Sequence, residues 1–184
     1  LQRFQGRVYE TYADDLCESA LQSRSVDRVW FASKGEIPEQ GQKIPDVVIE
    51  SGGALFPIEV TWKQPGPSTL VSGDFSKILK MFLRVWVGDR PLKKEGELWQ
   101  LESWVSWFRN GGKLPGCGLT RDCEIFPLLI TPRGVPQELG MTSRWTSAIS
   151  SNGIGTWMAK RVGFMSTYEF ETALFLASKG FRLE

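Results

Sequence analysis

Two carboxylates stand in apolar, β-prone parts of the chain. Asp46 directly precedes the apolar run 47–49, and Glu59 lies between Ile58 and Val60. Taking a lone carboxylate out of water is costly, so such a group must be paired, hydrogen-bonded or bound to a metal. Two carboxylates on one face supply the oxygen ligands that Mg²⁺ or Mn²⁺ prefers. The pair therefore indicates a divalent-metal site.

The segments that carry these carboxylates are expected to pair as a β-hairpin. Ser51-Gly52-Gly53 is a turn signal between the β-prone runs 47–49 and 54–62. Asp46 and Glu59 lie at similar distances on either side of this turn. They are therefore predicted to be cross-strand neighbours.

A lysine is expected on the same face as the carboxylates. Side chains alternate along a strand, so Glu59, Thr61 and Lys63 should point one way and Trp62 the other. The chain contains no histidine, which excludes Ser-His triads, histidine-based zinc sites and two-histidine phosphodiesterases. A metal ion plus an ammonium group is sufficient for phosphodiester hydrolysis without imidazole.

These residues resemble the PD-(D/E)XK nuclease superfamily, which has the restriction-endonuclease-like fold. The resemblance covers roughly residues 5–85 and rests on Pro45-Asp46, the hairpin and Glu59. Members commonly carry a glutamate on the preceding helix, and Glu10 looks like its counterpart. The resemblance implies a nuclease that uses Mg²⁺ or Mn²⁺, held by Asp46, Glu59 and Glu10, with DNA favoured over RNA as substrate. Lys63 would join Asp46 and Glu59 as a catalytic residue.

One position departs from the family pattern. The pattern expects lysine two residues after the glutamate, where this chain has Thr61. Lys63, one strand period further on, is the first alternative. Lys77 or Lys80, reaching in from the next helix, is the second. The third is a catalytically inactive domain of the same fold that binds nucleic acid or a protein partner.

The helix expected after the hairpin carries a basic stripe. Lys77, Lys80 and Arg84 are spaced three and four residues apart and share one side. The resemblance places this helix beside the site, where the stripe would bind a nucleic-acid backbone. A solvated helix face is the alternative. The formal net charge of +1 indicates no partner by itself.

Periodicity and capping signals predict an α/β fold with a small mixed central β-sheet flanked by helices, in a single domain 1–184. A proline at position 127 requires a β-prone run to be an edge strand or to be bulged. Residues 110–165 are expected to form an irregular insertion or specificity region, and no element is assigned over 133–161. Helices are predicted over about 4–21, 75–83, 97–108 and 167–179, and further strands over 29–31 and 125–130.

The three cysteines form no C-x-x-C pair, which fits neither a disulfide framework nor a zinc ribbon. Reduced thiols and an intracellular location, cytoplasmic or nuclear, are therefore expected. No apolar run has the length of a membrane span, and the N-terminal residues lack the pattern of a signal peptide. Because the chain begins with Leu1, it is expected to be part of a longer polypeptide.

Overall fold

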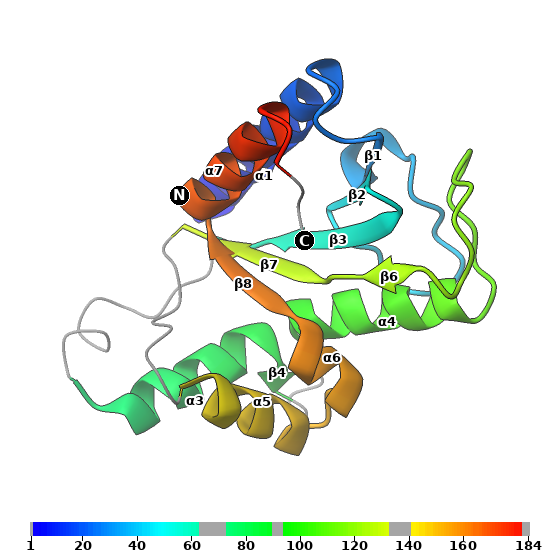
Figure 1. Cartoon of the computed structure of the whole chain (residues 1–184). Coiled ribbons are helices and arrows are strands. Elements are labelled where there is room, and N and C mark those ends of the chain that lie inside the picture. Colours follow the sequence, from blue (N-terminus) through cyan, green and yellow to red (C-terminus); the bar gives the residue numbers. More distant parts are fainter. Residues whose placement is uncertain (1, 63–72, 90–93, 133–140, 182–184) are drawn as a thin grey trace.

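A mixed β-sheet runs through the centre of the protein (Figure 1). The computed structural model describes residues 2–62, 73–89, 94–132 and 141–181. The main path of the sheet has the order β1-β2-β3-β7-β8, and β6 pairs with β3 beside this path. The strands are β1 (Arg28–Phe31), β2 (Val47–Ser51), β3 (Ala54–Val60), β6 (Glu124–Ile125), β7 (Leu128–Thr131) and β8 (Gly163–Ser166).

The strand directions divide the sheet into two parts. β1, β2 and β3 are antiparallel to one another, whereas β3, β7 and β8 are parallel. β2 and β3 form the predicted hairpin, in the register Val47 to Ile58. Its turn residues Gly52 and Gly53 have φ angles of 59° and 83°, as the tight hairpin turns that match strand twist require. The α/β class and the mixed central sheet are as predicted.

Helices cover both faces of the sheet (Figure 1). One face packs against α1 and α7 through a core that includes Cys17, Val47 and Phe170. The opposite face packs against α3, α4, α5 and α6 through two further apolar clusters. The helices are α1 (Gln2–Gln22), α3 (Phe75–Trp86), α4 (Glu97–Arg109), α5 (Met141–Ser151), α6 (Thr156–Arg161) and α7 (Thr167–Ser178). A 3-10 turn, η1 (Ala32–Lys34), and the small pair β4 (Gly88–Asp89) and β5 (Lys94–Glu95) complete the described elements.

All four predicted helices are present, and two of them begin with side-chain caps. The Asp74 carboxylate accepts a hydrogen bond from the backbone N–H of Lys77 at the start of α3. Ser166 and Glu169 form a reciprocal capping box at the start of α7. Each cap satisfies backbone N–H groups that would otherwise lack a partner in the first helical turn.

Of the two expectations for the strand around Pro127, an edge position or a bulge, the edge position is wrong. β7 lies between β3 and β8, inside the sheet. Pro127 instead falls at an interruption that separates β6 from β7, two short strands that both pair with β3. The missing proline N–H is tolerated at this break, and the Pro127 carbonyl still accepts a hydrogen bond from Gly163 (2.8 Å). Residues 133–161, to which no element was assigned, include α5 and α6 over their described part, and β8 follows after them.

The cysteines are free thiols: Cys17 is buried in the core, while Cys117 and Cys123 are partly exposed. No helix in the described ranges is both long enough and apolar enough to cross a membrane.

Gly96, which begins α4, is in close contact with the backbone of Trp86. A Cβ atom at this position would lie 2.3 Å from the Trp86 carbonyl oxygen, which belongs to the backbone and cannot move aside cheaply. We expect Gly96→Ala to lower the free energy of unfolding by about 1–3 kcal/mol, as other overpacked sites do. Urea unfolding measures this change.

Gly118→Ala is the matched control, because a Cβ atom at Gly118 meets nothing within 4 Å. Its effect should stay within about 0.5 kcal/mol. Equal effects of the two substitutions would contradict the close packing at the start of α4.

Candidate functional site

Buried polar side chains gather at one end of the sheet. Within the described residues, four polar or charged side chains are buried, with 2% to 7% of their surface exposed. They come from the ends of β3 and β7 and from the first residue of α4: Glu59, Thr61, Thr131 and Glu97. In parallel sheets, ligands bind outside the carboxyl ends of the strands. This grouping is therefore the candidate site.

Asp46 stands at the same end of the sheet, just before β2. The pairing of Val47 with Ile58 places Asp46 opposite Glu59, one position beyond the ladder. The Asp46 Oδ2 atom accepts a hydrogen bond of 2.8 Å from the backbone N–H of Val60. The hairpin therefore holds the Asp46 carboxylate beside the residue that follows Glu59.

The surroundings of Asp46 disfavour its charged form. Burial is the largest cause and, together with the charges of Glu10, Glu97 and Asp14, it raises the pKa of Asp46 to about 7. The Val60 N–H acts in the opposite direction and lowers that pKa. Glu10 and Asp14 belong to α1 and Glu97 to α4. Acidic groups from both layers of helices therefore act on Asp46 at the sheet end.

Helix α4 holds the buried carboxylate of β3. Gln100 Nε2 donates a hydrogen bond to Glu59 Oε1, and Thr61 Oγ1 donates one of 3.1 Å to Glu97 Oε1. Glu97 and Gln100 are three residues apart and lie on the same side of the helix. The sequence interpretation included neither residue in the site. The available signal was a polar pair, Glu97 and Gln100, at helical spacing at the start of a predicted amphipathic helix.

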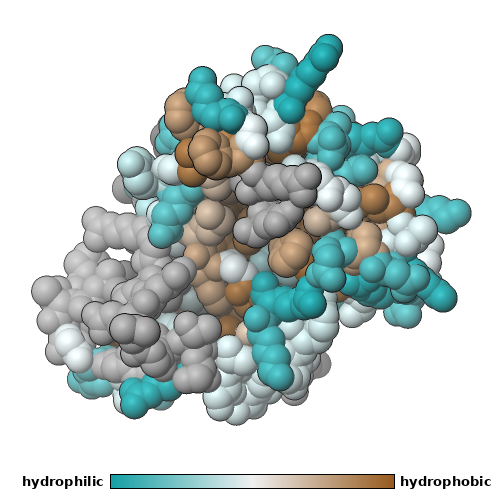
Figure 2. All heavy atoms as spheres, in the orientation of Figure 1, coloured by the Kyte–Doolittle hydropathy of each residue, from teal (hydrophilic) through white to brown (hydrophobic). Residues whose placement is uncertain are grey.

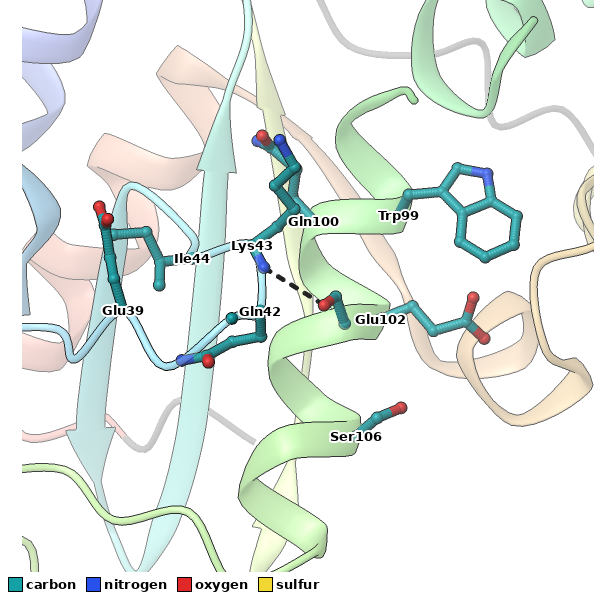
Figure 3. A pocket seen from close by; sticks show the side chains of 10 residues that line it. Glu39, Gln42, Lys43, Ile44, Trp99, Gln100, Glu102 and Ser106 are labelled. Atoms are coloured by element: carbon teal, nitrogen blue, oxygen red, sulfur yellow. Dashed lines mark hydrogen bonds between the residues drawn. The ribbon is translucent and has the colours of Figure 1, made fainter. Parts of the chain in front are cut away.

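A cleft of about 880 Å³ opens along α4 next to this group. The loop 39–44 forms one wall, and the backbone N–H of Lys43 bonds to Ser103 Oγ of α4 at 3.3 Å (Figure 3). Gln100 lines the cleft on the side of the loop, whereas Trp99 projects from the other side of α4 (Figure 3). The residue that binds Glu59 is therefore also a wall of the cleft.

The predicted alternation along β3 is observed. Glu59 and Thr61 face α4, through Gln100 and Glu97. Trp62 lies on the other side, edge-on to Tyr9 of α1 with 5.4 Å between the ring centroids. Thr61 thus shares the face of the carboxylates. Lys63, the lysine expected to complete the site, lies outside the described residues.

The structure also places the remaining predicted site residues. Glu10 is exposed on α1, and it is close enough to Asp46 to raise that residue's pKa. Lys77, Lys80 and Arg84 are exposed on α3, which packs against α4 and α5. Lys77 also forms an ion pair of 3.3 Å with Asp74.

The carboxylates fit a cation that uses few protein ligands. Over the described ranges, no three Asp, Glu or Cys side chains lie together as a ready-made metal site. Mg²⁺, however, commonly binds one or two protein carboxylates and fills its other positions with water and substrate phosphate. A nearby cation would also offset the acidic surroundings that raise the pKa of Asp46. Asp46 and Glu59 are therefore the residues suited to hold such an ion.

A scan against protein-family models and searches of curated proteins and of solved structures give no match. Function is therefore inferred from the residues and their geometry.

Proposed function

We propose that the protein is a divalent-metal-dependent nuclease that hydrolyses phosphodiester bonds, with DNA preferred over RNA. The observation that carries this proposal is the gathering of buried polar side chains beside Asp46, at the end of the hairpin. Buried carboxylates are costly unless they are compensated. A fold that places several together at a sheet end, next to a cleft, favours a functional site over a structural one.

The architecture is compatible with the PD-(D/E)XK resemblance. A mixed sheet is flanked by helices, and an acidic pair lies across one hairpin that follows an acidic helix. Asp46 and Glu59 take the positions of the family's two hairpin carboxylates, and Glu10 takes that of the helical glutamate. These correspondences support the restriction-endonuclease-like fold as part of the proposal.

In this proposal, Mg²⁺ or Mn²⁺ held by Asp46 and Glu59, with Glu10 assisting, would activate water and offset negative charge on the phosphate. The chain's own groups fix the two ligands. The Val60 N–H orients the Asp46 carboxylate, and the Gln100 amide orients that of Glu59. Such orienting partners tune the affinity of a metal site.

The lysine role belongs to Lys63 in this proposal. An ammonium group near the carboxylates would stabilise the charge that develops on the phosphate. Position 61 cannot supply the ammonium group, because its residue is a threonine. Thr61 is buried and donates a hydrogen bond to Glu97 instead. Lys63 lies outside the described residues and is proposed from its place in the sequence, two residues after Thr61.

The cleft along α4 and the basic stripe on α3 are the proposed substrate contacts. Lys43 supplies a cationic side chain among the residues that line the cleft. Lys77, Lys80 and Arg84 are exposed and available to phosphate oxygens. Contacts of this kind bind the nucleic-acid backbone without reading its sequence.

Thr61 favours a second candidate function. The position that carries lysine in the family pattern is occupied here by a buried hydroxyl that donates to Glu97. If no other lysine replaces it, the domain would retain the fold and bind nucleic acid or a protein partner without cutting.

The proposal is tested by incubating the protein with supercoiled plasmid and with RNA, in Mg²⁺, in Mn²⁺ and in EDTA. We expect nicking or linearisation of the plasmid that requires the divalent ion and weaker cleavage of RNA. Lys63→Ala should slow cleavage by about 100-fold or more, because it removes a charge aimed at the transition state. Lys113→Ala, an exposed lysine outside the proposed site, is the control. Retention of plasmid binding without cleavage in either metal would support the second candidate.

A further inference from the structure

The outer side of α7 carries large apolar side chains that are open to solvent. Tyr168, Phe175 and Leu176 are 76%, 58% and 42% exposed. Helix α1 packs alongside α7 (Figure 1) and adds Val8 and Tyr12, at 52% and 40%. We call these five residues the α1/α7 patch. Apolar and charged side chains are intermixed over this part of the surface (Figure 2). Exposed apolar groups on two neighbouring helices make this surface a candidate for a protein interaction site.

The charges beside the patch are arranged symmetrically about Phe175. Glu171 lies four residues before it and Lys179 four residues after it, so the three share one side of the helix. The Lys179 ammonium lies 5.3 Å from the centre of the Phe175 ring. Glu171 forms a side-chain hydrogen bond with Tyr12 of α1. The side of α7 that carries Phe175 is thus acidic towards its start and basic towards its end.

We propose that a second copy of this chain docks on the α1/α7 patch, with the two α7 helices antiparallel and crossing at Phe175. A two-fold axis at this residue brings Glu171 next to Lys179 of the partner subunit, and symmetry repeats the pair. The antiparallel arrangement also sets the positive start of each helix near the negative end of the other. A parallel arrangement would place like charges together. The charge pattern therefore favours a second copy of this chain as the partner, with the two α7 helices antiparallel.

The two helices set the dimensions of such an interface. The 12 residues of α7 span about 18 Å and the 21 residues of α1 about 32 Å. Side by side, they offer a face with the aromatic side chains of Tyr12, Tyr168 and Phe175 exposed on it. Aromatic side chains of this kind commonly carry much of the binding energy of an interface.

The test is sedimentation equilibrium of the full chain, with a charge swap as the decisive comparison. We expect the native chain to dimerise and Phe175→Glu to weaken association by about 100-fold or more. Glu171→Lys and Lys179→Glu should each weaken it by about tenfold, and the double variant should return to within about threefold of native. Trp157→Glu, which replaces an exposed aromatic residue on α6, should dimerise like the native chain.

Three results would overturn the inference. The first is a native chain that stays monomeric up to about 1 mM. The second is dimerisation of Phe175→Glu equal to that of the native chain, which would place the interface elsewhere. The third is a charge swap that does not restore what each single reversal loses, which would exclude the antiparallel pairing. All four substituted side chains are exposed, and circular dichroism checks that each variant is folded.

Discussion

Asp46→Asn is expected to make the folded protein more stable at pH 8 while it removes a proposed metal ligand. Burial, followed by the neighbouring carboxylates, raises the pKa of Asp46 to about 7, against an ordinary value of 3.8. One pKa unit corresponds to about 1.4 kcal/mol, so the ionised carboxylate destabilises the fold by at most about 4 kcal/mol. Partial exposure of Asp46 to solvent reduces this value. Asparagine keeps an oxygen that can accept from Val60 and carries no charge.

The sign of the pH dependence follows from the direction of the shift. A raised pKa means that the folded state binds the proton more tightly than the unfolded state. The stability contributed by protonated Asp46 is complete below about pH 4 and is lost as pH rises to about 7. The advantage of Asp46→Asn over the native chain should therefore grow between pH 4 and 7 and level off above. Urea unfolding at several pH values in EDTA measures it.

Asp74→Asn is the control of opposite sign. The backbone N–H of Lys77 is the largest cause that lowers the pKa of Asp74, so its ionised form is favoured by folding. This substitution should cost more stability as pH rises through the range in which aspartate ionises. If the difference in the free energy of unfolding between the native chain and Asp46→Asn is the same at pH 5 and pH 8, Asp46 titrates normally.

Glu59→Gln is expected to reduce divalent-dependent cleavage by about 100-fold or more, since it removes a charged ligand from the reacting site. The fold should tolerate the change. A glutamine carbonyl can accept the Gln100 hydrogen bond that Glu59 accepts now, and the side chain keeps nearly the same shape. Single-turnover cleavage of plasmid measures the rate, and urea unfolding checks stability.

Gln100 is a positioning residue in this account. Gln100→Ala should reduce cleavage by about 10-fold to 100-fold, the usual effect of removing a group that orients a metal ligand. The Gln100→Ala variant should also need a higher Mn²⁺ concentration to reach half of its maximal cleavage rate. Gln42→Ala is the matched control, because Gln42 also lines the cleft but donates to the Pro38 carbonyl. Equal losses of cleavage rate in the two variants would show that both act through the cleft, and that the hydrogen bond of Gln100 to Glu59 has no special role.

Elements with strong local signals could be predicted from the sequence. The Gly52-Gly53 turn and the capping box of α7 depend on residues close together in the chain, and both are present. Residues 141–161 offered no such signal. Their helices form because side chains such as Trp145 and Ile149 are buried in the core beside α3 and α4. Long-range packing thus decides what a weak local pattern leaves open.

The same distinction between local signals and long-range packing applies to the candidate site. Asp46 and Glu59 were identifiable because charged residues in apolar strands are conspicuous, and hairpin register relates their positions. The contribution of α4 was not identifiable in this way. Gln100 and Glu59 are 41 residues apart in sequence, and only the packing of α4 on β3 brings them together. The error at Pro127 arose because a proline excludes one ladder hydrogen bond, which a break between two short strands also accommodates.

The most direct test of the proposed site is a calorimetric titration of Mn²⁺ into the native chain, Asp46→Asn and Glu59→Gln at pH 8. We expect one binding event in the native chain that is lost or weakened by about 100-fold in each variant, since each removes a carboxylate ligand. The same ion should raise the melting temperature of the native chain alone, because a ligand that binds only the folded state stabilises it. Equal Mn²⁺ binding by all three proteins, or none by the native chain, would contradict the assignment of Asp46 and Glu59 as a metal site.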